Sequence, residues 1–192
     1  KIPGLFVSVS RPSHRKTPWT QLERFPDGIE IVNFDAQFQR QVYQNPFSML
    51  ATLALFPFNA FLASARFQQI YPKDLSSWDA MNSVSPGHFG LLASDAHPLI
   101  DKESVSWTWP NYSSIFALGS NRVFLKAPLS KNPVEAQLQL YRAIRQGSLA
   151  VSFDNVYAFE GNDFFLQCGA NEFRPGDKIL PPGTCQFVVR FP

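Results

Sequence analysis

Short apolar runs separated by helical stretches dominate the first 155 residues of the 192-residue chain. Residues 5–10, 28–33 and 90–93 consist mainly of aliphatic and aromatic side chains, as buried strands do. The stretches between them are long enough for helices, and strands that alternate with helices form parallel sheets. The sequence therefore predicts an α/β fold, with one domain over residues 1–155 and a small appendage after it.

The third apolar run ends in an aspartate and a histidine two residues apart, Asp95 and His97. Residues i and i+2 of a strand point to the same face, so we expect both side chains to project together at the strand's carboxyl end. A carboxylate beside an imidazole suits zinc, manganese or iron. The alternative is that Asp95 caps the following segment and His97 is an ordinary loop residue, since a two-residue motif is often fortuitous.

Two further features lie near the expected carboxyl edge of the sheet. Glu30 stands inside an apolar run, and an unpaired buried carboxylate is costly, so we expect a cation, a metal site or an exposed face to accommodate it. The loop after the first run carries Arg11 and His14 together with two more cations. Such a loop can hold an anion, although most charge clusters are solvated loops.

A helix is expected over residues 35–44, and the 25 residues between Arg40 and Arg66 have no formal charge. Length alone would permit a membrane span there, but its prolines and Asn59 oppose one, so we expect two buried helices broken near Pro57. A further helix over residues 75–81 is expected to have Ser76 or Ser77 as its N-cap. No membrane span is expected.

From residue 156 onward, short apolar runs alternate with glycine- and proline-containing turns, which predicts a β-hairpin or small β-sandwich over residues 156–192. Cys168 and Cys185 lie in this segment. They could pair across neighbouring strands in an oxidising compartment or remain free thiols in a reducing one, and free thiols are the expectation.

The net charge of +2 and the lack of a basic stripe with interleaved aromatics give no indication of nucleic-acid binding. No signal peptide is visible, so the compartment stays open, with the cytoplasm favoured. The chain starts at Lys1 and enters a strand almost at once. We therefore expect upstream sequence to be missing, since an incomplete sheet leaves its edge open. The sequence does not indicate an oligomeric state.

The order of these motifs is similar to that of a known family. A strand followed by Arg11 and Pro12, the run Gly28–Asn33, the sequence Ser-Asp-Ala-His at residues 94–97 and a β-rich tail occur in one order. In this the chain resembles the C-terminal part of the PHP (polymerase and histidinol phosphatase) family of metal-dependent phosphoesterases, in its form with a β-rich extension.

The resemblance implies the C-terminal part of a distorted (β/α)7, TIM-like barrel with a divalent metal site at the carboxyl ends of its strands. It implies zinc, manganese or iron bound by Asp95, His97 and, as a supporting residue, Glu30. It further implies hydrolysis of a small phosphorylated substrate by metal-activated water. Substrate identity is not indicated.

The chain departs from the family in two places. It lacks the HxH motif of the family's first strand, and Arg11 occupies the position of a metal-binding histidine. A guanidinium cannot ligate a metal. His14 could substitute for that histidine if its loop folds back, or Arg11 could supply the charge that a metal once provided. Three interpretations follow: an incomplete or degenerate phosphoesterase, a non-catalytic protein that binds an anion or partner, and a structural module that shares only the fold.

Overall fold

The structure, a computed structural model, describes residues 4–5, 7–8, 26–66, 68–96, 100–101, 108–109, 112–156, 159–179 and 184–192. The elements of this part of the chain, in order, are β1 Val7–Ser8, β2 Gly28–Asn33, α1 Phe34–Gln44, α2 Pro46–Leu55, α3 Ala60–Ala65, α4 Pro72–Val84, β3 Phe89–Ala93, β4 Ile100–Asp101, β5 Thr108–Trp109, α5 Tyr112–Phe116, β6 Ser120–Val123, α6 Pro133–Arg145, β7 Leu149–Ser152, β8 Asp163–Cys168, β9 Asn171–Phe173 and β10 Cys185–Arg190.

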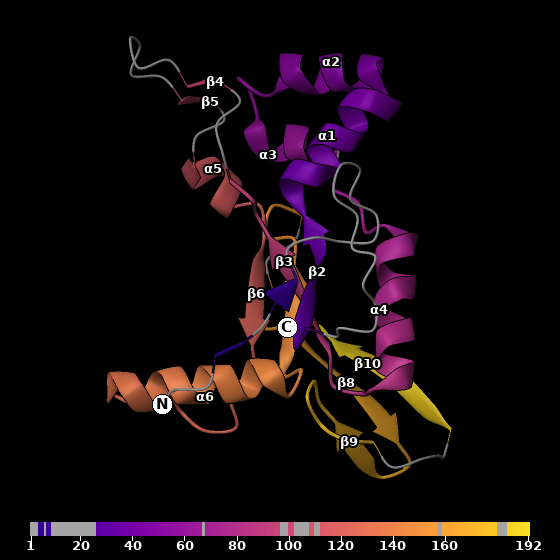
Figure 1. Cartoon of the computed structure of the whole chain (residues 1–192), viewed down its shortest axis with the longest axis vertical. Coiled ribbons are helices and arrows are strands. Elements are labelled where there is room, and N and C mark those ends of the chain that lie inside the picture. The colour runs from indigo at the N-terminus through magenta and orange to yellow at the C-terminus, as the bar shows by residue number, and fades with distance from the viewer. Residues whose placement is uncertain are drawn as a thin grey trace.

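A three-stranded parallel sheet in the order β1-β2-β3 lies at the centre (Figure 1). Helices α1 to α3 lie at one end of it, α6 lies at the other, and α4 runs alongside β2 (Figure 1). The α/β content is as predicted. The described residues form four sheets, of three, three, two and two strands, and none of these sheets closes into a barrel. The (β/α)7 barrel therefore stays a prediction.

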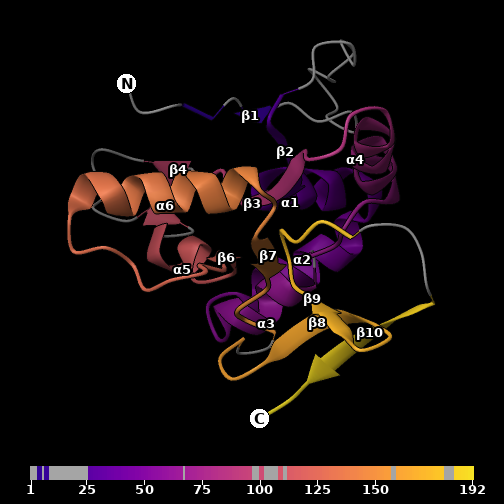
Figure 2. The same cartoon turned by 90° about the horizontal axis from the view of Figure 1, so that it is seen from below.

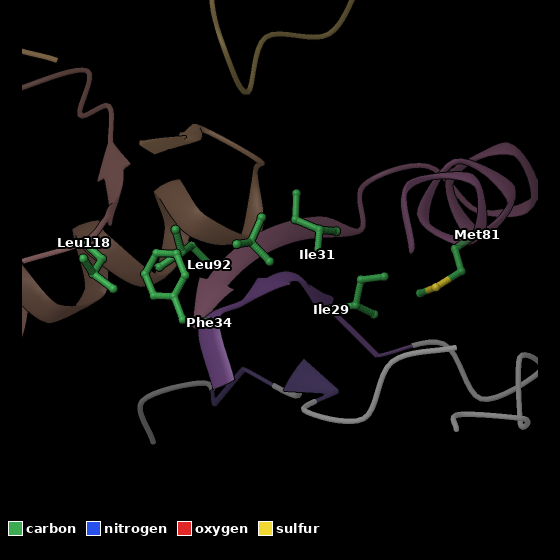
Figure 3. Close-up of a cluster of buried hydrophobic side chains, with 7 residues drawn as sticks. Ile29, Ile31, Phe34, Met81, Leu92 and Leu118 are labelled. Carbon is green, nitrogen blue, oxygen red and sulfur yellow. The ribbon is translucent and has the colours of Figure 1, made fainter. Parts of the chain in front are cut away.

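The core of the molecule forms around β2, whose six residues are all buried. Ile29 and Ile31 of this strand pack with Met81 of α4, and Phe34, Leu92 and Leu118 gather at the other end of the cluster (Figure 3). Burying both faces of a parallel strand requires a continuous apolar run, and the sequence of β2 supplies one except at Glu30 and Asn33.

The antiparallel pair β6-β7 lies beside β3 and is attached through a side chain. The amide of Asn121 in β6 accepts a hydrogen bond from the backbone N–H of Leu92 and donates one to its carbonyl, at 2.9 and 2.8 Å. Seen from below, β1, β2 and β3 are followed by β7, and the sheet of β8 to β10 lies beyond it (Figure 2).

The tail forms an antiparallel sheet in the order β10-β8-β9, as the turn pattern predicts. Phe164 of β8 contacts Phe124 and Phe159 edge-on, which packs the tail against the segment that follows β6. Cys168 and Cys185 face each other across β8 and β10 and form a disulfide. The expectation of free thiols was wrong, because the strand register places the two residues directly opposite one another.

The charge-free stretch forms two helices, α2 and α3, that are separated at Pro57 as predicted. Their burial was predicted wrongly: Phe47 of α2 is 83% exposed and Leu62 of α3 is 56% exposed. A short helix that is apolar all round cannot bury every side against one neighbour, and α2 turns only Met49 and Thr52 inward. In the part of the chain that the structure describes, no helix is both long and apolar enough to cross a membrane.

Two local predictions also need correction. Helix α4 begins at Pro72, with proline in its first turn, so Ser76 and Ser77 lie inside the helix and donate to the carbonyl of Lys73 rather than capping it. The sequence of residues 101–111, which is rich in serine and contains two tryptophans, predicts a loop, but residues 100–101 and 108–109 form the short antiparallel pair β4-β5.

Candidate functional site

The carboxyl ends of β1, β2 and β3 lie at one edge of the central sheet, because the three strands are parallel. This is the edge where open α/β sheets place their binding sites. Asn33 ends β2 and pairs in register with Ala93, the last residue of β3. Asp95 follows two residues later, so the sequence-predicted ligands Glu30 and Asp95 both belong to this edge.

One asparagine side chain connects these two carboxylates. The Nδ2 of Asn33 donates hydrogen bonds to Glu30 Oε2 at 2.9 Å and to Asp95 Oδ2 at 3.2 Å. The two carboxylate oxygens are therefore no farther apart than the sum of these distances. Glu30 is only 9% exposed and Asn33 is buried, whereas Asp95 is exposed. The buried carboxylate predicted to need a partner thus receives a hydrogen bond from a neutral amide.

A β-bulge in β2 brings Glu30 and Asn33 to the same side. In a regular strand, residues three apart point to opposite faces. Here the pairing with β3 shifts between Glu30 and Val32, which inserts Ile31 as an extra residue. The extra residue reverses the alternation beyond it, so the two side chains meet. The sequence alone carries no signal for this bulge.

Asp95 does not lie in a strand, contrary to the prediction. Strand β3 ends at Ala93, and Asp95 has a φ of +46°, in the left-handed region. Aspartate tolerates this conformation better than most residues, at a cost of order 1 kcal/mol. The side chain is therefore directed by a turn after β3 rather than by strand alternation.

Three other predicted site residues, Arg11, His14 and His97, lie outside the described residues. Arg11 and His14 follow β1, and His97 comes two residues after Asp95. Within the described ranges, no group of three or more His, Cys, Asp or Glu side chains is placed to hold a metal ion. The described part of the candidate site is therefore the pair Glu30 and Asp95 with Asn33 between them.

A second polar cluster, which sequence reasoning missed, follows β7. Asp154 accepts hydrogen bonds from Ser152 Oγ at 2.6 Å and from the Arg122 guanidinium at 3.0 Å. Partial burial raises the pKa of Asp154, but the hydrogen bonds from Ser152 and Arg122 and the charge of Arg122 help to outweigh it, so the pKa is lowered. The sequence predicts a strand over residues 149–153, and the aspartate directly after it was the available signal.

This second cluster has a structural role. The guanidinium of Arg122 lies 5.8 Å from the ring centre of Phe159, at the start of the tail. Asn121, the neighbour of Arg122 in β6, reaches β3 instead. Because successive strand residues point to opposite faces, Arg122 faces away from β3. The cluster therefore connects β6 and β7 to the tail.

His88 precedes the apolar run at residues 90–93, at the opposite end from Asp95, so the sequence predicts a structural role for it. Its Nδ1 lies 2.6 Å from the carbonyl of Pro26, and its own carbonyl accepts a hydrogen bond from Trp78. An apolar cavity of about 240 Å³ opens beside it, lined by residues from the amino ends of β3 and β7. This confirms that His88 is remote from the carboxyl edge, and the cavity belongs to that remote end.

No protein-family model matches the chain, and no curated protein or solved structure is significantly similar to it. The candidate site consequently rests on its own geometry and on the resemblance of its motifs.

Proposed function

We propose that the carboxyl edge of the β1-β2-β3 sheet forms part of a divalent-metal site of the phosphoesterase type, with Glu30, Asp95 and His97 as ligands. One observation carries the proposal: Asn33 brings together two predicted ligands, 65 positions apart in the sequence, at the edge where such sites lie. The PHP-like order of the motifs supports the same assignment.

The donor set fits zinc, manganese or iron in its chemistry. Two carboxylates and one imidazole are oxygen and nitrogen donors that these metals accept. Such a metal supplies an activated water and neutralises charge on a phosphate ester. The proposed substrate is a small phosphorylated molecule. The protein's own contribution is Asn33, which orients the two carboxylates.

Arg11 and His14 are proposed to act on the substrate side of this site. Both follow β1, whose carboxyl end lies at the same edge as that of β2. A guanidinium binds phosphate oxygens through two parallel hydrogen bonds, and an imidazole can transfer a proton near neutral pH. Arg11 is proposed to bind the phosphate group, and His14 to serve as a proton donor or a substitute ligand.

The alternative is a non-catalytic protein that binds an anion through Arg11. It is favoured by the arginine at the position where the similar family has a metal-binding histidine. In that case, Arg11 supplies the positive charge that a metal would otherwise provide.

Elemental analysis of the purified full-length protein separates these functions. After supplementation with zinc, manganese and iron in turn, we expect near-stoichiometric metal that is lost in Asp95→Ala/His97→Ala. The control Asp79→Ala, an exposed carboxylate of α4, should retain it. Wild-type protein with no bound metal would contradict the metal site, and phosphate binding that disappears in Arg11→Ala would then support the alternative.

A further inference from the structure

Asn33 has two structural functions at once. It is the last residue of β2 and the N-cap of α1, with the extended backbone that an N-cap requires. Its Oδ1 accepts a hydrogen bond from the backbone N–H of Ala36 at 2.9 Å. This bond satisfies one of the N–H groups left open in the first turn of the helix.

The capping bond fixes which way the amide faces. Because Oδ1 is directed at the helix, Nδ2 is directed at the carboxylates. It donates one hydrogen bond to Glu30 and one to Asp95. A serine or aspartate can accept the capping bond equally well. Neither can also donate two hydrogen bonds at the reach of an asparagine amide.

We propose that Asn33 is the positioning residue of the carboxylate pair: one amide sets the relative placement of Glu30 and Asp95, so that the pair and the first turn of α1 form together. The expected effect of Asn33 on metal binding rests on the proposed function. Its effect on the positions of Glu30 and Asp95 does not depend on that function.

The connection bridges two parts of the chain that are distant in sequence. Glu30 comes from the bulged strand β2, and Asp95 from the turn after β3, 62 residues beyond Asn33. The left-handed backbone of Asp95 needs surrounding contacts to hold it, and the bond from Asn33 is one of them. Loss of the amide donor is therefore expected to release this turn.

Replacing the donor while keeping the cap isolates the proposed role. Asn33→Asp retains a capping oxygen but places a third carboxylate between Glu30 and Asp95. Asn33→Ser retains the cap and removes the double donor. Asn132 offers a matched control, since it caps α6 by accepting from the N–H groups of Val134 and Glu135, with its capping oxygen on the protein surface.

The first measurement is thermal unfolding of the chelator-treated full-length protein. We expect the Tm of Asn33→Asp to fall well below that of wild type, because three carboxylates repel one another, while Asn132→Asp leaves the Tm nearly unchanged. We also expect the Tm losses of Asn33→Ser and Asp95→Ala to be less than additive when combined. The reason is that each variant removes the same hydrogen bond, between Asn33 and Asp95. Equal Tm changes for Asn33→Asp and Asn132→Asp would overturn the proposal.

The second measurement is manganese titration of the same proteins. Residues that orient metal ligands typically change affinity about 10- to 100-fold when replaced, and we expect such a loss in Asn33→Ser but none in Asn132→Ser. Manganese should restore the Tm of Asn33→Asp, because the added carboxylate lies next to the ion; a residue that only capped a helix would show no such rescue.

The two proposals fail separately. If wild type binds no manganese, the proposed function fails. The Tm values of the chelator-treated variants still decide whether Asn33 positions the carboxylates. If wild type binds manganese and Asn33→Ser binds it equally well, the positioning role is wrong and the metal site stands.

Discussion

At the scale of single residues, an amide links the two carboxylates of the candidate site. A buried carboxylate can be stabilised by an ion pair or by hydrogen bonds, and Asn33 supplies a hydrogen bond to Glu30 without adding a positive charge. A neutral partner leaves the negative charge of the carboxylate pair uncompensated by that contact.

Asp154 provides a pH-dependent contribution at this scale. Its pKa is lowered in the folded protein, where hydrogen bonds and Arg122 outweigh the effect of burial. The folded protein therefore gains stability from the ionised form above about pH 4, the ordinary range of aspartate, and loses it as the pH falls through the lower folded pKa. We expect Asp154→Asn to be less stable than wild type at pH 7 and to lose less stability on acidification.

Urea unfolding at pH 7, 5 and 3 measures this difference. The control is Asp79→Asn, an exposed carboxylate of α4, which should follow the wild-type curve. An Asp154→Asn variant whose stability falls with pH as steeply as that of wild type would show that the cluster does not contribute.

Individual side-chain placements were the least predictable part of the site. Residue types in the sequence identified Glu30 and Asp95 as candidates, but not the contact between them. That contact needs the bulge at Ile31 and the left-handed turn at Asp95, which are backbone irregularities set by packing with β3 and its neighbours. A two-residue motif read as a regular strand therefore gave the wrong local geometry for Asp95.

At the scale of elements, helix α2 is apolar and yet largely exposed. Its inward residue Met49 is 4% exposed, whereas Phe47 is turned to the surface. We expect Met49→Ala to cost about 2–5 kcal/mol through the cavity it leaves. The change Phe47→Gln should alter the free energy of unfolding by less than about 0.5 kcal/mol, as surface substitutions do.

Urea titration of the two variants checks this contrast, and light scattering of Phe47→Gln shows whether the exposed face promotes self-association. A large loss of stability in Phe47→Gln would mean that this side chain is buried in solution by a contact outside the described structure. Similar small losses in both variants would contradict the orientation of α2.

Element types followed from the sequence more reliably than burial did. Local sequence patterns located β2, α1 and β7, because such patterns depend only on residues close together in the chain. The break at Pro57 was predictable for the same reason. Exposure of α2 and pairing of the cysteines were not, since both depend on which elements become neighbours.

At the scale of the whole molecule, the candidate site and the tail belong to different packing units. Glu30, Asn33 and Asp95 lie on the central sheet, and the tail is attached to β6 and β7 through Phe124, Arg122 and a surface ion pair between Lys126 and Asp177. The disulfide between Cys168 and Cys185 closes a loop wholly within the tail. The site should therefore tolerate loosening of the tail.

Removal of the disulfide tests this separation. A cross-link with a sequence separation of 17 stabilises by about 3 kcal/mol in the loop-entropy model. We expect Cys168→Ser/Cys185→Ser to lose about that much stability in the tail and to show faster amide exchange in β8 and β10, with exchange in β2 and β3 unchanged. Manganese affinity, where wild type shows any, should also be unchanged. Faster exchange in β2 as well would mean that the tail and the central sheet unfold together.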